Sequence, residues 1–214
     1  MRLLYLNPNS TVAMTDSIVA SARRAVPGAA VTGWTNAGGP PAIQGPADGD
    51  AAVPGLLAML PAARDHGADV IVIACFDDTG LEQLRAAAHC PVIGIGQAAY
   101  HMAGLRAGGF TVLTTLPVSI PVIEGNVARQ GFARQCHGIK ASGFPVLTVE
   151  EGAPDTLGTL AGQASALYAT EAVPVVLGCA GMTAHLEKLA AQTGAPLIDG
   201  VRAAAHLGRA LALS

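Results

Sequence analysis

Two short apolar runs, within residues 69–74 and 173–177, most constrain what this chain can fold into. Apolar residues follow one another in both runs instead of alternating with polar ones. Strands have this pattern when helices cover both faces of a parallel sheet. Stretches of helical length, many of them rich in alanine, separate most of the candidate strands, so the sequence predicts an α/β fold with mainly parallel sheets.

Predicted strands and helices alternate along the whole chain. The remaining predicted strands cover residues 2–6, 30–34, 91–95, 110–114, 146–149 and 196–198. The predicted helices cover residues 12–25, 51–66, 81–88, 97–106, 120–130, 154–170, 186–193 and 201–211. Residues 36–50, rich in Gly and Pro, are predicted to be a loop that either covers the mouth of a cleft or forms a solvated connector.

An internal repeat indicates how these elements are grouped. Residues 81–93 align without gaps with residues 186–198, about half the chain further on, and just before each copy a strand ends in a cysteine, Cys75 or Cys179. The repeat predicts two similar parallel-sheet α/β halves related by pseudo-twofold symmetry, with the active site in the cleft between them. We assign residues 1–97 and 201–214 to the first half and residues 98–200 to the second.

Cys75 and Cys179 are the strongest candidates for chemistry. Each precedes a predicted helix, whose N-terminal N–H groups are expected to lower the thiol pKa. Racemisation needs a base on one face of a carbon and a matching acid on the other, and a thiolate and a thiol can supply both. A single free cysteine is more often a small buried core residue. The equivalent positions of the two cysteines in the repeat favour catalysis.

The segment after Cys75 carries a helix-start signal. Thr79 and Glu82 fit a capping box, so a helix is expected to begin there.

The other two cysteines lack such a setting. Cys90 precedes a predicted strand and Cys136 follows a predicted helix, and we interpret both as structural.

Composition excludes several classes of protein. The net charge of -3, without a basic cluster, argues against a nucleic-acid surface. Neither a signal peptide nor a membrane span is expected, so we predict a cytoplasmic protein with reduced thiols. We expect no metal, because the Cys136-His137 pair lacks the spacing of zinc ligands. We also expect no dinucleotide cofactor, since the glycine motif at residues 94–99 lacks the acidic residue that should follow it.

Six motifs resemble those of the aspartate/glutamate/hydantoin racemase superfamily, and within it the hydantoin and allantoin racemases. They occur in the same order over nearly the whole chain, at residues 7–11, 39–45, 75–81, 94–99, 114–116 and 177–182. The motif around Cys179 is the most specific of them. Thr79 stands where many hydantoin racemases have proline, so residues 75–80 look nearer to the allantoin-type members.

The resemblance implies a cofactor-free racemase of a cyclic ureide, either a 5-substituted hydantoin or allantoin, that moves the C5 proton with two thiols. It also implies a homo-oligomer whose other partner is a small-molecule substrate. Polar residues at the strand ends are expected to bind that substrate, namely Asn9, Ser10, Thr11, Thr114 and Thr115. For residues 9–11 the alternative is a cap on the first helix.

Other groups complete the expected site. Backbone N–H groups near Phe76, Ala180 and Gly181 are expected to stabilise the enolate oxygen that forms when the proton leaves. Gly178 and its small neighbours allow a ligand to approach the backbone closely, and Ile43 is expected to wall the pocket for the substituent.

Two other functions remain open at this point. An amino-acid racemase of the aspartate/glutamate type, or a related decarboxylase, would share the scaffold. A free amino acid needs charged partners, however, and the segments around the cysteines supply only Asp77 and Asp78. The presence of both cysteines also counts against the decarboxylases, in which one thiol suffices. A non-catalytic small-molecule binding protein with buried cysteines is the alternative from another class.

Overall fold

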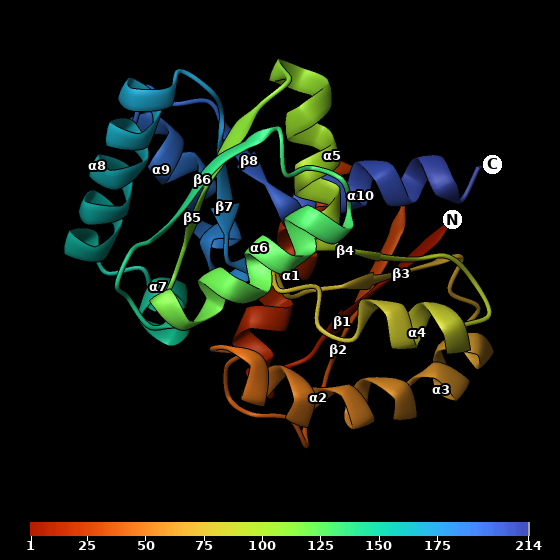
Figure 1. The fold of residues 1–214 in the computed structure, drawn as a ribbon. Helices are drawn as coiled ribbons and strands as arrows, with labels where there is room; N and C mark the ends of the chain where they lie inside the picture. The colour runs from red at the N-terminus through yellow and green to blue at the C-terminus, as the bar shows by residue number, and fades with distance from the viewer. Residues whose placement is uncertain (214) are drawn as a thin grey trace.

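The structure, a computed structural model, describes residues 1–213 and contains two four-stranded parallel sheets (Figure 1). The first sheet has the order β2-β1-β3-β4 and comprises β1 (Arg2–Asn7), β2 (Ala30–Thr35), β3 (Val70–Ile73) and β4 (Val92–Gly94). The second has the order β6-β5-β7-β8 and comprises β5 (Phe110–Thr114), β6 (Cys136–Ala141), β7 (Val175–Gly178) and β8 (Leu197–Asp199). The identical strand orders confirm the prediction of an α/β fold with two similar halves.

Helices connect the strands in both halves. They are α1 (Val12–Ala25), α2 (Pro46–Ala58), α3 (Leu60–Asp65), α4 (Leu81–Ala87), α5 (Ile95–Ala107), α6 (Ile120–Arg129), α7 (Val146–Glu151), α8 (Pro154–Glu171), α9 (Leu186–Gln192) and α10 (Gly200–Leu211), with short 3-10 helices η1 (Pro117–Ser119) and η2 (Ala180–His185). The single helix predicted at residues 51–66 begins earlier and is divided into α2 and α3. Pro61 lies in the first turn of α3, where its missing N–H costs no intrahelical hydrogen bond, and it therefore favours a new helix start at this point.

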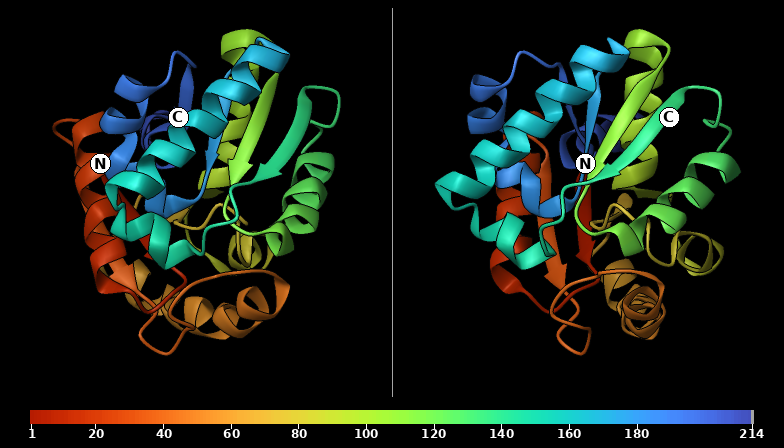
Figure 2. Two further views of the ribbon diagram at one scale, coloured as in Figure 1. Left: turned by 90° about the vertical axis from the view of Figure 1, so that its left-hand side faces the viewer. Right: turned by 60° about the vertical axis from the view of Figure 1, so that its left-hand side comes forward.

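Side chains that alternate along each strand pack into separate cores. On β1, Leu3 and Tyr5 belong to a core shared by both sheets and by α1, α5 and α10, whereas Leu4 and Leu6 pack beneath α2, α3 and α4. On β7, Val176 faces the shared core, and its neighbours pack against α7, α8 and α9. Figure 2 shows helices on both faces of the second sheet. This double covering explains the continuous apolar runs of β3 and β7.

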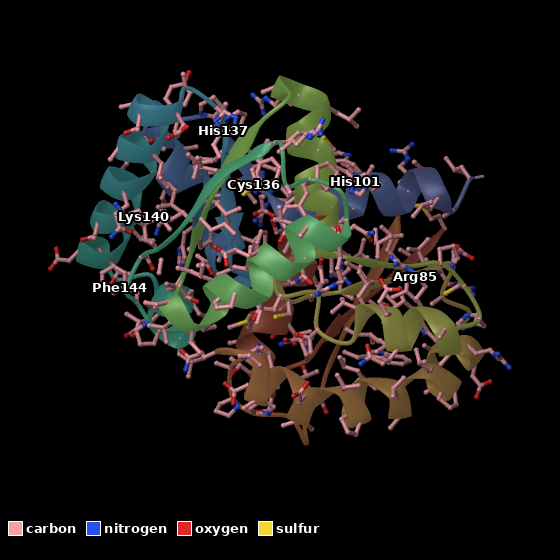
Figure 3. All side chains as sticks on the ribbon, in the orientation of Figure 1. Arg85, His101, Cys136, His137, Lys140 and Phe144 are labelled. Atoms are coloured by element: carbon pink, nitrogen blue, oxygen red, sulfur yellow. The ribbon has the colours of Figure 1, made fainter. Side chains whose placement is uncertain are left out.

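One predicted strand is wrong. Residues 146–149 lie in α7, which begins directly after Pro145, and the strand that pairs with β5 at one edge of the second sheet is β6 instead. Every residue of β6 is at least partly exposed, and the strand includes His137 and Lys140, so it lacks the apolar run of a central strand. Cys136, which was expected to follow a helix, opens this strand beside His137 (Figure 3).

The helices that follow β4 and β8, which are α5 and α10, cross between the halves. Helix α10 packs against β1, β3 and β4 of the first sheet, and α5 packs against β5, β7 and β8 of the second. The two helices also pack against each other, and the buried hydroxyl of Tyr5 donates a hydrogen bond to the carbonyl of Val201 at 2.9 Å. The assignment of residues 201–214 to the first half remains our proposal, and the position of α10 supports it.

The close pairing of β5 and β7 generates a prediction about stability. Gly178→Ala should lower the free energy of unfolding by about 1–3 kcal/mol, because a Cβ there would lie 2.9 Å from the Leu113 carbonyl oxygen and 2.9 Å from Val112 Cγ1. The matched change Gly158→Ala meets nothing within 4 Å on α8 and should raise it by about 0.5–1 kcal/mol. Urea unfolding followed by circular dichroism measures both, and equal effects would contradict the prediction.

Candidate active site

A small pocket lies where the strand order reverses in both sheets, between β1 and β3 and between β5 and β7. Ligands of open α/β sheets bind at such points, beyond the carboxyl ends of the strands. The pocket has a volume of about 20 Å³, room for about one water molecule. Residues of both halves line it: Asn9, Met14, Ile43, Ala74, Cys75, Phe76, Asp77, Thr114, Thr115, Ser119, Val146, Gly178, Cys179 and Ala180.

The structure brings Cys75 and Cys179 together in this pocket. Cys75 comes two residues after the end of β3, and Cys179 directly follows β7. Each half therefore contributes one thiol from the matching pair of strands. All four cysteines are free thiols, and Cys90 and Cys136 do not line this pocket.

The expected lowering of the thiol pKa values is wrong. Burial raises the pKa of Cys75 well above its usual value, and the carboxylate of Asp77 raises it further. Burial likewise raises the pKa of Cys179 to about 12, although the N–H of Gly181 partly opposes this. Desolvation disfavours the thiolate, and the charged groups that act on both sulfurs are acidic.

The capping box expected after Cys75 does not form. Gly80, in a left-handed conformation, precedes α4, and no side chain caps the helix. Asp78 is also left-handed, and its carboxylate accepts hydrogen bonds from the N–H groups of Gly96 and Gln97 at 2.9 and 2.8 Å. The carboxylate thereby caps α5 rather than facing the pocket. A Cβ at Gly94 would collide with this side chain, which explains one glycine of the motif at residues 94–99.

Of the three residues predicted after β1 to bind substrate, residues 9–11, only the first lines the pocket, and the other two hold the loop that follows β2. Asn9 lines the pocket, and its Oδ1 accepts a hydrogen bond from Asn7 Nδ2 at 2.9 Å. Ser10 and Thr11 do not line the pocket. The Ser10 N–H and the Thr11 hydroxyl instead donate to carbonyl groups of the loop, at Pro40 and Pro41. Thr11 is the N-cap residue of α1, but its side chain makes no capping hydrogen bond.

The loop after β2 lies over the pocket, so the structure supports the first of its two interpretations. Ile43 lines the pocket and is 6% exposed. The next side chain, Gln44, accepts a hydrogen bond from the Val146 N–H of the second half at 3.0 Å. The loop therefore connects the two halves across the site.

The second half contributes most of the residues expected from it. Thr114 and Thr115 line the pocket, and the Thr114 hydroxyl donates to the Gly178 carbonyl at 3.0 Å. Ala180 is also part of the lining. Gly181 is not, because it packs against Glu150 of α7, where an added Cβ would lie 3.2–3.3 Å away.

Five lining residues were not predicted: Met14, Ala74, Asp77, Ser119 and Val146. Asp77 is the most consequential, because burial raises its pKa to about 7, and a hydrogen bond from Ser119 partly opposes this rise. The position of Asp77 two residues after Cys75 could have indicated that it lines the pocket. Val146 was missed because residues 146–149 were predicted to form a strand, and nothing in the sequence pointed to Ser119.

Comparison with known proteins identifies the family of this chain. The model of the family described as Asp/Glu/Hydantoin racemase matches residues 3–208. The chain belongs to this family. It is therefore a racemase, and so an isomerase. A hydantoin racemase of Rhizobium meliloti is 40% identical over 99% of this chain and 88% of its own length.

Solved structures of two allantoin racemases share the fold of this chain. The allantoin racemase from Klebsiella pneumoniae superposes with a TM-score of 0.93 at 34% identity, over all of this chain and 88% of that one. The allantoin racemase from Pseudomonas fluorescens gives a TM-score of 0.91 at 30% identity, over 99% and 90% of the two chains.

Within residues 1–213, no three His, Cys, Asp or Glu side chains are grouped so that they could hold a metal ion. None of the helices in the same range has the length and the apolar composition that crossing a membrane requires.

The influence of Asp77 on the thiols can be measured directly. With a pKa of about 7, Asp77 is ionised in the alkaline range where thiols titrate, and its charge raises the pKa of both Cys75 and Cys179. Asp77→Asn should therefore shift the thiolate absorbance at 240 nm toward lower pH. Asp155→Asn on the exposed start of α8 should leave the titration unchanged. A shift of equal size in both variants would contradict the assignment.

Proposed function

We propose that the protein racemises a five-membered cyclic ureide, a 5-substituted hydantoin or allantoin, by two-thiol proton transfer at C5 and without a cofactor. One observation carries this proposal: the free thiols of Cys75 and Cys179 reach the same pocket from equivalent strand ends of two similar halves. The names of the similar proteins, hydantoin racemase and allantoin racemase, support the choice of substrate.

The proposed reaction exchanges one proton. The C5–H bond is adjacent to a carbonyl group, so its loss forms an enolate within the flat ring. One cysteine thiolate takes this proton from one face, and the thiol of the other cysteine gives its own proton to the opposite face. The two sulfurs exchange roles for the other enantiomer, which is why the two sites should be chemically alike.

Backbone N–H groups support each sulfur in its ionised form. The N–H groups of Gly181 and Met182 lower the pKa of Cys179, and the N–H of Asp77 lowers the pKa of Cys75, although burial outweighs both effects. Gly181 therefore serves the thiolate in our proposal, rather than the substrate. Phe76 and Ala180, which line the pocket, remain the proposed positions of N–H groups for the enolate oxygen.

The composition of the pocket favours a neutral substrate over a free amino acid. An amino acid would bring a carboxylate, and none of the described residues that line this pocket is Lys, Arg or His. Burying an unpaired carboxylate is costly. A hydantoin ring brings only carbonyl and N–H groups, which Asn9, Thr114 and Thr115 can match by hydrogen bonding.

The family resemblance extends the proposal beyond the site. We infer a homo-oligomeric protein of the cytoplasm, with a small-molecule substrate and without nucleic-acid or membrane partners.

Replacement of the cysteines tests the mechanism. Cys75→Ala and Cys179→Ala should each lower racemisation of an enantiopure hydantoin to the uncatalysed rate, because one acid or base is then missing. Optical rotation against time, together with deuterium entry at C5 in D2O, measures this loss. Cys90→Ala is the matched control and should retain activity. Full racemisation by the double Cys75/Cys179 variant would refute the mechanism.

The raised thiol pKa values predict the pH dependence of the reaction. A group whose pKa is raised loses its proton at higher pH, so the fraction with one thiolate grows as the pH rises. Below the lower of the two thiol pKa values, kcat/KM should rise with pH, roughly tenfold per unit. Initial rates from pH 6 to 9 in constant ionic strength measure this. A kcat/KM that falls over this range would contradict the prediction.

A further inference from the structure

A second and larger cavity adjoins the pocket that contains the thiols. Its volume is about 560 Å³, compared with about 20 Å³ for the inner pocket, and Asp77 lines both. Its walls come from the start of α2, the segment that follows Cys75, and α6. A five-membered ring needs more room than the inner pocket has, so the pocket walls must move apart to hold a ring between the two thiols. The outer cavity is then the adjoining space into which a substituent on C5 can extend.

Three residues that line this outer cavity carry a buried polar atom without a hydrogen-bond partner among the described residues: Oδ2 of Asp77, Oε1 of Gln130 and Oγ1 of Thr79. An ionised carboxylate and an amide oxygen can only accept a hydrogen bond, whereas the Thr79 hydroxyl can also donate one. The remaining atoms of Gln130 are committed, because its Nε2 donates to Asp78 Oδ2 at 3.2 Å. A buried acceptor without a donor is costly. A ligand that supplies N–H groups would remove this cost.

Of the other side chains that line the cavity, Asn126 is already hydrogen-bonded and most of the charged ones are acidic. The side-chain amide of Asn126 donates to the Asp77 carbonyl at 2.8 Å. Asp50 and Glu82 also line the cavity, opposite one cation, Arg129. This balance favours hydrogen-bond donors over a carboxylate at the end of the substituent.

We propose that the outer cavity is the subsite for the 5-substituent, and that Asp77 and Gln130 select substituents that carry N–H donors, such as a ureido, carbamoyl or amino group. This inference rests on the proposed function and deepens it, because it separates substrates with polar N–H groups from alkyl and aryl hydantoins. Asp77 and Gln130 thus determine specificity, while Cys75 and Cys179 transfer the proton.

The experiment compares two substrates whose 5-substituents are of similar size but differ in hydrogen-bonding groups. Allantoin carries a ureido group, and 5-isobutylhydantoin carries an alkyl group of nearly the same shape. Deuterium uptake at C5 in D2O, corrected for uncatalysed exchange, gives kcat/KM for each. The ratio of the two values is the readout, because any effect of a variant on the thiols acts on the same C5 carbon in both substrates. A hydantoin with an aminoalkyl group distinguishes cationic from neutral donors.

Three variants give separate expectations. Asp77→Leu should lower the ratio of allantoin to 5-isobutylhydantoin by roughly tenfold or more, as expected for the loss of a charged acceptor. Gln130→Leu should lower it several-fold. Gln163→Leu is the matched control, because its Oε1 is also buried without a partner and its Nε2 also donates, but it does not line the cavity. It should leave the ratio unchanged.

The outcomes separate this inference from the proposed function. If the wild-type protein exchanges the C5 proton of both substrates but Asp77→Leu and Gln130→Leu leave the ratio unchanged, the subsite is wrong and the racemase proposal stands. A wild-type preference for the isobutyl compound would also overturn the subsite. If the wild-type protein exchanges neither substrate, the proposed function fails and the subsite fails with it. Activity on 5-isobutylhydantoin shows that each variant is folded.

Discussion

Burial of one face of each sheet in a common core is the interaction on which the rest of this structure depends. Strand residues such as Tyr5 and Val176 from the two halves enter the same apolar cluster, together with α1, α5 and α10. Helices α5 and α10 each also pack against strands of both sheets. Apolar burial is the dominant favourable contribution to folding. It holds the carboxyl ends of the two central strand pairs at one site, and neither half alone contains both thiols.

The burial that assembles the site also determines its electrostatics. Desolvation is the main reason why the pKa values of Cys75, Cys179 and Asp77 are all raised. A site of this kind disfavours charge, and a neutral ring whose charge appears only on proton removal suits it better than a zwitterion. Backbone N–H groups at the two sulfurs partly offset the cost of forming a thiolate. Two like groups with raised pKa values also match the symmetric demand of racemisation.

Adjacent aspartates have different tasks in this fold. The carboxylate of Asp78 is occupied by the N–H groups at the start of α5 and stabilises the turn after β4. Asp77 keeps one oxygen without a partner at the boundary between the inner pocket and the outer cavity. Both residues line the outer cavity, but only Asp77 also lines the inner pocket.

The sequence by itself determined the parallel α/β architecture, the two similar halves and the pairing of Cys75 with Cys179. Continuous apolar runs and an internal repeat can be recognised in the sequence without knowledge of which distant residues are in contact. Only the tertiary structure decided that residues 146–149 are helical and that β6 is a strand, because the β-branched run of residues 146–149 and the polar composition of β6 gave the opposite local signals. It also decided which neighbours of the motifs reach the pocket. Gly181, Ser10 and Thr11 turn toward other segments, while Ser119 and Val146 enter from elements far away along the chain. The raised thiol pKa values could not be predicted from the sequence, because they arise from burial by residues of both halves. The sequence shows only the helix starts after the cysteines, and these led to the opposite prediction.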